Sequence, residues 1–249
     1  MKKLSKLCLF LLAFLILSTG TIVFAEEYGS YQEALEAYKA KGYKRLTKLK
    51  TPVIVEAESF INEGMEREPR SGEIPKVEIV TEKQEKGDKV VTYVTNWKER
   101  YHYLEYMVKV PQTGLYSITF VYRIPRSERD TGVFVRALTL NEEEPFAQAG
   151  RLTLPKGETM PGSSQVLGDP FYDWTVQKIK AQLDQFVEEP YLFYLEKDKE
   201  YLVRLTSRGG GIDFDYFAFT EAHKSTPKAL VGLKRMWDLL IASFKAPKK

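Results

Sequence analysis

The feature that most restricts the fold is a pair of alternating segments in the middle of the chain. Residues 103–110 read Tyr-Leu-Glu-Tyr-Met-Val-Lys-Val, and residues 115–124 read Leu-Tyr-Ser-Ile-Thr-Phe-Val-Tyr-Arg-Ile. Alternation of this kind, rich in aromatic and β-branched side chains, is typical of strands. Pro111 ends the first segment, and Gln112, Thr113 and Gly114 form the turn. Because strands joined by so short a turn are usually neighbours, the sequence predicts an antiparallel hairpin here.

Shorter segments of the same character occur on both sides of this pair. They are residues 53–58, 77–80, 90–96, 132–140, 191–195, 200–206 and 212–219. The period of residues 174–183 does not decide between strand and helix. Many short strands separated by turn signals predict an all-β domain, a β-sandwich over residues 52–221.

Two helices are expected outside the sandwich. Ser30 and Glu33 form a capping box, which predicts a short helix within residues 26–51, followed by a basic linker. Residues 222–249 carry Leu, Ile, Trp and Phe at helical spacing, with Lys and Arg beside them. This pattern predicts a C-terminal amphipathic helix. Its apolar face, Pro227 to Phe244, could contact the sandwich, a protein partner or a membrane surface.

Residues 1–25 have the composition of a secretory signal peptide. Lys2, Lys3 and Lys6 precede an apolar run, and Val23-Phe24-Ala25 offers a cleavage site. Cys8 lies inside the run, so the sequence does not predict a lipoprotein; an uncleaved N-terminal anchor is the alternative. The prediction is a secreted, extracellular protein associated with the cell envelope.

Charge and cysteine content restrict the chemistry of the mature chain. Of 37 basic and 34 acidic residues, three basic ones belong to the signal peptide, which leaves the mature chain neutral. We therefore expect no nucleic-acid binding. The single cysteine also belongs to the signal peptide, so neither disulfides nor thiol chemistry is expected.

Acidic pairs occur in the first and last predicted strands. Glu56 and Glu58 are two residues apart, as are Asp213 and Asp215, so each pair would share one face of its strand. If the strands meet, the carboxylates gather, and calcium prefers several carboxylate and carbonyl oxygens. The alternative is that all four acids are solvated on an open face.

Three segments together resemble carbohydrate-binding modules of families six and thirty-five. They are Val55-Glu56-Ala57-Glu58, residues 103–116 with their Tyr-x-Val-x-Val-Pro-like pattern, and Ile212-Asp213-Phe214-Asp215-Tyr216-Phe217. The resemblance implies a jelly-roll sandwich of the galactose-binding type. Residues 133–146 and 189–195 are also similar to the N-terminal sandwich domain of some large secreted sugar-transporter solute-binding proteins of Gram-positive bacteria.

The resemblance also implies ligands. It makes Glu56, Glu58 and Asp215 the ligands of a structural calcium ion, completed by backbone carbonyls. Family-six modules have an asparagine at the sugar site where this chain has Asp213, so the family's site is not carried over unchanged.

For the sugar itself, flat aromatic faces and a few polar groups are required. Trp97, Tyr101 and His102 stand in a segment that matches a ligand-facing loop of the family, and Arg208 and Asp213 flank Gly209–Gly211. These five residues are the predicted ligand-binding set. The alternative for Trp97 and Tyr101 is a position in the core or at its rim.

The sequence shows no nucleophile elbow, zinc-protease motif or phosphate loop. We therefore predict a non-catalytic carbohydrate-binding protein, acting in sugar uptake or polysaccharide use. The alternatives are an interaction domain that kept the sandwich without sugar binding, and a glycosidase, which needs only two carboxylates.

Overall fold

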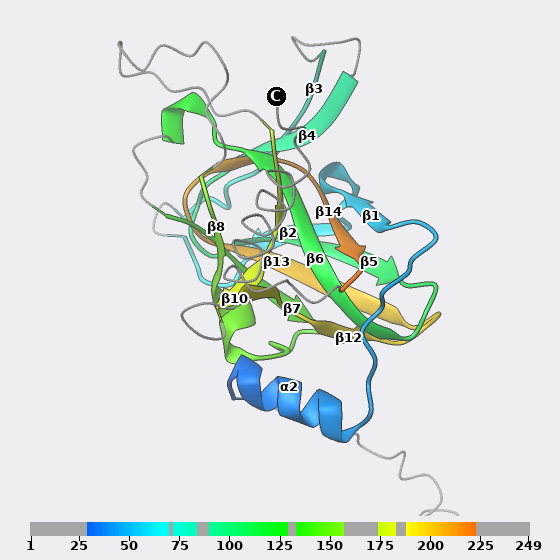
Figure 1. The fold of residues 1–249 in the computed structure, drawn as a ribbon. Helices are drawn as coiled ribbons and strands as arrows, with labels where there is room; N and C mark the ends of the chain where they lie inside the picture. The colour runs from blue at the N-terminus through cyan, green and yellow to red at the C-terminus, as the bar shows by residue number, and fades with distance from the viewer. Residues whose placement is uncertain are drawn as a thin grey trace, which may run out of the picture.

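The computed structural model describes residues 29–69, 72–83, 90–128, 133–156, 174–182 and 188–222. These residues form two large antiparallel sheets with one short helix, α2 (Tyr31–Ala40), beside them (Figure 1). The predicted all-β sandwich with a short N-terminal helix is confirmed. The predicted signal peptide and C-terminal helix fall on residues 1–25 and 223–249, outside the described residues. Within the described part, no helix is long and apolar enough to cross a membrane.

The larger sheet contains seven strands in the described residues. Its order is β12 (Phe193–Leu195), β6 (Gly114–Arg123), β14 (Ile212–Thr220), β4 (Val90–Trp97) and β3 (Glu78–Lys83). Two more strands extend it: β1 (Val53–Glu56) pairs with β14, and β9 (Thr175–Lys178) pairs with β6. The first and last strands of the sandwich are thus direct neighbours, as the acidic pairs require.

The second sheet contains five described strands. Their order is β2 (Asn62–Met65), β5 (His102–Lys109), β13 (Glu200–Gly209), β7 (Phe134–Leu140) and β8 (Leu152–Leu154). A small separate pair, β10 (Lys180–Gln182) and β11 (Glu188–Pro190), completes the strands. Residues 174–183, which could have been strand or helix, therefore contribute β9 and β10. Short 3-10 turns occur at η1 (Ala57–Ser59), η2 (Arg126–Glu128) and η3 (Ala147–Arg151).

The predicted hairpin over residues 103–124 is wrong. β5 pairs with β2 and β13 in one sheet, whereas β6 pairs with β9, β12 and β14 in the other. The turn at Pro111 therefore carries the chain from one sheet to the other. Pro111 has no N–H to extend a ladder, and the carbonyl of Val110 instead accepts from the Asp198 N–H at 3.1 Å. Buried and exposed side chains alternate in the same way in two strands of one sheet and in two strands that face each other across a core. The alternation therefore could not show which strands are hydrogen-bonded.

Aromatic side chains from both sheets fill the space between them. On β6 the side chains of Tyr116, Ile118, Phe120 and Tyr122 alternate into the core and are almost fully buried. Tyr106 of β5 meets Phe217 of β14 edge-on, with ring centroids 5.1 Å apart. Fully burying an apolar side chain contributes roughly 1.5–3 kcal/mol, so this aromatic layer is the main stabilising element of the sandwich.

Helix α2 and the segment after it are part of this packing. The capping box is present: Ser30 Oγ accepts from the Glu33 N–H, and the Glu33 carboxylate accepts from the Ser30 N–H at 2.6 Å. The buried face of α2 consists of Tyr31, Ala34 and Tyr38. The Tyr31 hydroxyl donates to the carbonyl of Pro190 at 3.2 Å and accepts from the Leu192 N–H at 3.0 Å. The helix is therefore fixed to the chain that leads into β12.

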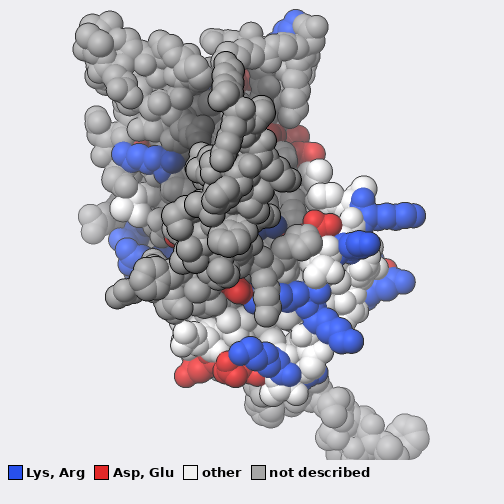
Figure 2. All heavy atoms as spheres, in the orientation of Figure 1, with Lys and Arg blue, Asp and Glu red and all other residues white. Residues whose placement is uncertain are grey.

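The basic segment after α2 lies along the sandwich. Leu46 donates its N–H to the carbonyl of Leu115 at 3.0 Å and accepts from the Ala222 N–H at 2.7 Å. Leu46 and Leu49 pack against the core, whereas Lys44 and Lys48 are exposed. Figure 2 shows basic side chains along the side of the molecule where this segment runs in Figure 1. Its leucines thus face inward and its lysines face solvent.

Candidate functional site

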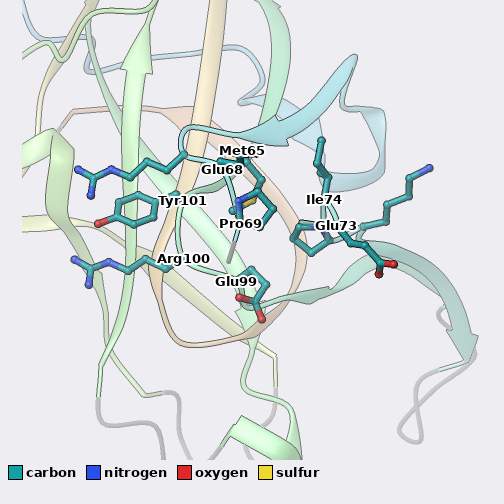
Figure 3. Close-up of a pocket in the computed structure, with 11 residues that line it drawn as sticks. Met65, Glu68, Pro69, Glu73, Ile74, Glu99, Arg100 and Tyr101 are labelled. Carbon is teal, nitrogen blue, oxygen red and sulfur yellow. The ribbon is translucent and has the colours of Figure 1, made fainter. Parts of the chain in front are cut away.

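A cleft of about 1000 Å³ lies between the chain that follows β2 and the connection from β4 to β5 (Figure 3). Its apolar lining consists of Met65, Pro69, Ile74 and Pro75, together with the ring of Tyr101. Its charged lining consists of Arg67, Glu68, Glu73, Lys76, Glu99 and Arg100. A ring face beside apolar and charged groups is the combination that sugar recognition requires.

Tyr101 is held in this cleft by an unusual backbone. Its φ is 73°, in the left-handed region that bulky residues avoid. Two hydrogen bonds fix the residue: its N–H donates to the carbonyl of Ser207 at 2.7 Å, and its carbonyl accepts from the Glu66 N–H at 2.9 Å. A backbone of this kind costs on the order of 1–3 kcal/mol and is often found at functional sites. The position of the half-buried ring is therefore determined by the fold.

Three guanidinium groups surround the Tyr101 ring. Those of Arg67, Arg100 and Arg208 lie 4.3, 5.1 and 5.6 Å from the ring centroid. Arg208 is paired with the Glu66 carboxylate, which also accepts from the Thr206 hydroxyl at 2.7 Å. The structure thus brings together two residues of the predicted ligand-binding set, Tyr101 and Arg208. Their role in sugar binding stays a prediction.

Trp97 differs from the expectation of a ligand-facing ring. Its side chain is fully buried, 5.6 Å from the ring of Phe214, and its Nε1 donates to the carbonyl of His102 at 3.1 Å. The reason is a β-bulge: Trp97 pairs with Ile212 and Val94 with Phe214, so β4 has one extra residue. Asn96, at a φ of 59°, lies in this bulge and turns Trp97 toward the core. The alternative, a core aromatic, describes its position.

A buried arginine lies against Trp97. The Arg136 guanidinium is 4.3 Å from the indole ring, and its Nη2 donates to the Trp97 carbonyl at 3.0 Å. Its Nη1 donates to the carbonyls of Val135, Gly209 and Gly210 at 2.9–3.2 Å. Burial lowers the pKa of Arg136 to about 9. Arg136 therefore joins β7, the β13–β14 turn and β4 behind the cleft.

His102 also lies in the core and not on the surface. Its imidazole is fully buried, and Nε2 is 2.9 Å from Glu63 Oε1. The same carboxylate oxygen accepts from the Val77 N–H at 2.6 Å. Burial lowers the pKa of His102, although the neighbouring Glu63 carboxylate acts in the opposite direction. The imidazole therefore has no face for a sugar and instead connects β5 with β2.

Asp213 belongs to a different network. It is 4% exposed and accepts from Arg123 Nε at 2.8 Å and from the Thr95 hydroxyl at 2.5 Å. Arg123 also donates to Glu82 at 2.5 Å and to the Tyr93 hydroxyl at 2.8 Å. Both carboxylate oxygens of Asp213 thus accept hydrogen bonds from neighbouring strands of the larger sheet, and Asp213 does not line the cleft.

The acids predicted to bind calcium lie near the β1–β14 pair but not as expected. β1 ends at Glu56, and Glu58 lies in the turn η1, so the two do not share a strand face. Asp215 is the extra residue of a bulge between Phe214 and Tyr216, and Glu56 is opposite Tyr216. One oxygen of Glu58, Oε2, is buried without a hydrogen-bond partner, as a cation ligand would be.

The other two acids, Glu56 and Asp215, already interact within the chain. Among the described residues, no three His, Cys, Asp or Glu side chains are gathered closely enough to hold a metal ion. Calcium binding therefore stays a prediction.

Sequence reasoning missed the residues that form most of the cleft. Arg67, Lys76 and the apolar residues between them lie in a long polar segment without periodicity, and Arg100 stands between predicted strands. The only signal was local: Glu-Arg-Glu-Pro at residues 66–69 and Lys-Glu-Arg-Tyr at residues 98–101 place arginine next to groups that form turns. Their proximity depends on the pairing of β2 with β5, which brings Met65 opposite His102.

No protein-family model and no curated protein sequence matches this chain. Similar solved structures include a family 35 carbohydrate-binding module from Clostridium thermocellum, with 18% sequence identity over 69% of this chain and 99% of that chain, and a TM-score of 0.42. The family 6 module of lichenase 5A from Cellvibrio mixtus, solved with cellotriose, has 15% identity over 68% of this chain and 97% of that chain, with a TM-score of 0.38.

A third similar structure is the GH26-CBM35 β-(1,4)-mannanase of Podospora anserina, with 14% identity and a TM-score of 0.40. The match covers 72% of this chain and 29% of the mannanase. The structural neighbours are thus modules of the two families whose motifs the sequence resembles. Similarity at this level carries no statement about what this chain binds.

Proposed function

We propose that this chain is a non-catalytic carbohydrate-binding protein that holds a glycan in the cleft beside Tyr101. The observation that carries the proposal is the ring itself, which a costly left-handed backbone and two backbone hydrogen bonds hold between apolar and charged lining groups. A ring held in advance loses little conformational entropy when a sugar stacks on it. The arginine N–H groups of the cleft supply donors for hydroxyl oxygens.

We further infer that the protein acts outside the cell membrane, at the cell envelope, in sugar uptake or polysaccharide use. The support is the signal-peptide pattern of residues 1–25 and the resemblance of residues 133–146 and 189–195 to sandwich domains of sugar-transporter proteins. Fractionation of cells that express the full chain tests this inference. Retention of the protein in the cytoplasm, with residues 1–25 still attached, would contradict it.

The binding proposal is tested with residues 26–249 on a glycan array, followed by calorimetry with the glycans retained. The informative variant is Tyr101→Gly, because glycine adopts the left-handed backbone without strain while the ring is lost. We expect binding to weaken at least about tenfold with no loss of thermal stability, since a well-placed aromatic contact contributes about 0.5–1.5 kcal/mol beyond its buried area.

A matched control is Tyr103→Ala. Tyr103 also lies beside a guanidinium, that of Arg204 at 4.5 Å, but it does not line the cleft. The proposal predicts unchanged affinity for this variant. If no glycan on the array is retained, the chain is an interaction domain and the proposal fails. If a retained glycan is cleaved during incubation, the non-catalytic assignment fails.

A further inference from the structure

Two cations of the cleft have no acid to neutralise them. In the described part of the chain, neither Arg67 nor Arg100 forms an ion pair or a side-chain hydrogen bond, and both are exposed. Arg208, the third guanidinium at the Tyr101 ring, has Glu66 as its partner. Two positive charges therefore lie next to one ring without an ion-pair partner among the described residues, although like charges repel each other.

In the described residues, the cleft acids Glu68, Glu73 and Glu99 form no ion pair with these two arginines. Figure 3 shows Tyr101 and Arg100 extending to one side of the cleft and Glu73 on the opposite side, with Glu99 between them. Glu73 already has an interaction within the chain. The guanidinium groups around the aromatic ring thus lie at one end of the cleft, and Ile74 and Glu73 lie at the other.

We propose that Arg67 and Arg100 form a subsite for an oxyanion carried by the bound sugar, a carboxylate or a sulfate ester. This rests on the proposed glycan-binding function and adds the charge class of the ligand. A guanidinium presents N–H donors in a planar fork that matches the oxygens of such groups. Donors of Arg67 and Arg100 have no partner in the described residues, so none of the hydrogen bonds among these residues has to break before the anion binds.

The ring between the arginines explains why the anion would be part of a sugar. An isolated oxyanion needs only the two guanidinium groups, whereas Tyr101 adds an aromatic surface for the C–H groups of a pyranose. The exposed side chain of Arg67 or Arg100 moves from its position over the ring when the sugar stacks there. The subsite contains neither Trp97 nor Asp213, because the first is in the core and the second is bound to Arg123. It therefore shares Tyr101 with the ligand-binding set predicted from the sequence and replaces Trp97 and Asp213 by Arg67 and Arg100.

The test compares ligands that differ only in charge. Oligogalacturonate is titrated into residues 26–249 alongside its methyl ester, which keeps the same backbone and loses the carboxylates; a sulfated galactan oligosaccharide and its desulfated form make a second pair. We expect the charged member of at least one pair to bind about tenfold or more tightly than its neutral counterpart. The pair that shows the difference identifies the oxyanion. The affinity should also fall when the salt concentration of the assay is raised from about 50 to about 500 mM, because salt screens exposed ion pairs.

The variants are Arg67→Met and Arg100→Met, with Arg151→Met as the matched control. Arg151 is exposed but does not line the cleft. Each cleft variant should weaken binding of the charged ligand about tenfold, since a hydrogen bond to a charged group is worth about that factor. The control should not change it, and each cleft variant should weaken binding of the charged ligand more than binding of the neutral ligand.

The results of these binding experiments distinguish the anion subsite from the glycan-binding proposal on which it rests. Equal affinity for charged and neutral ligands, with Tyr101→Gly weakening both, overturns the anion subsite and leaves the glycan proposal intact. If Arg151→Met lowers the affinity for the charged ligand as much as the cleft variants do, the anion subsite is also overturned. The attraction between protein and ligand would then depend on the net charge of the protein and not on the cleft. Absence of binding to every saccharide overturns both proposals. Unfolding curves of all variants are recorded, and an unfolded variant is replaced by Arg→Gln at the same position.

Discussion

At the scale of single residues, the most informative side chains are those that the fold buries although the sequence suggested exposure. Trp97 and His102 stand in the same short segment as Arg100 and Tyr101, and residue type alone does not tell which of them face solvent. The structure separates them by two left-handed residues, Asn96 and Tyr101. The first turns Trp97 inward, and the second directs the tyrosine ring into the cleft.

Trp97→Ala should therefore destabilise the fold and should not act as a sugar-site mutation. Truncation of a buried tryptophan lowers the free energy of unfolding by about 3–5 kcal/mol, and here it also removes the contacts with Phe214 and Arg136. Urea unfolding of the wild type and the variant measures this loss. Unchanged stability together with lost glycan binding would return Trp97 to the sugar site.

His102 should make stability depend on pH in a defined range. Its folded-state pKa lies below 6.5, the ordinary value, because burial opposes the charged form. As the pH falls through 6.5, the unfolded chain binds the proton more readily than the folded chain, so the free energy of unfolding falls. Below the folded-state pKa both states bind the proton, and this dependence of the free energy on pH ends. The groups that act on His102 are Glu63, Glu99 and Arg136.

The measurement is urea unfolding at about pH 7.5, 6.5 and 5.5, with 6.5 the ordinary histidine pKa. Wild type and His102→Gln are compared, since glutamine keeps a polar group near Glu63 but cannot take up a proton. The stability of the wild type relative to the variant should be highest at the upper pH and decrease toward the lowest. A constant difference across the three values would show that His102 does not titrate differently in the two states.

At the scale of elements, periodicity predicted where strands lie but not which sheet contains them. Residues 103–110 and 115–124 were correctly predicted as strands, yet their pairing was wrong, because the Pro111 turn connects two sheets. Side-chain alternation records which face is buried, and both sheets bury a face toward the same core. The long-range partner of each strand therefore could not be derived from local sequence.

For the candidate site, too, local sequence identified some of the residues but not the segments that the fold brings together. Tyr101 was predicted because its segment matches a ligand-facing loop of the resembling family, and Arg208 because it flanks Gly209–Gly211; the structure places the two side chains together. Arg67 and Arg100 were missed because only the pairing of β2 with β5 brings their segments side by side. The bulges at Asn96 and Asp215 also have no signature in the alternation, and they moved Trp97 and the Asp213–Asp215 pair from their expected faces. The turn η1 did the same to Glu56 and Glu58.

The turn η1 next to the β1–β14 pair carries the calcium prediction. If Glu56, Glu58 and Asp215 bind the ion, it stabilises the folded state, by about 2.7 kcal/mol at a hundredfold excess over its dissociation constant. Excess chelator should then lower the melting temperature of metal-loaded protein, and Glu58→Gln should reduce that response. Glu78→Gln, an exposed acid of β3, is the control. An identical melting curve with and without chelator would rule the site out.

At the scale of the whole molecule, the described core begins at Tyr31 in α2 and ends at Ala222. Residues 26–51, expected to be a helix and linker, contribute Tyr31, Tyr38 and Leu46 to the packing. We therefore expect the sandwich and the helix to unfold as one cooperative unit, since they share buried side chains.

We predict that deletion of Pro227 to Lys249 leaves this unit folded, with the same melting temperature and the same response to chelator. The reason is that both sheets and α2, within residues 31–222, already share one set of buried side chains. If residues 227–244 form the predicted amphipathic helix, the deletion should also reduce co-sedimentation with anionic vesicles, because Lys and Arg next to Trp and Phe favour such surfaces. Equal pelleting of both proteins would exclude a membrane role, and a lowered melting temperature would place the segment on the sandwich.

The contact between Leu46 and Ala222 has a mechanical consequence. The segments that precede β1 and follow β14 meet at this contact, and beyond it β1 and β14 run antiparallel, with Val53 opposite Phe219 and Glu56 opposite Tyr216. A pulling force applied between residues 46 and 222 would load the bond from Ala222 to Leu46 first and then the strand pairs one after another. Bonds that are loaded in series break at low force, whereas bonds loaded in parallel resist together. Tension across this molecule would thus release β1 and η1 before the aromatic core is disturbed.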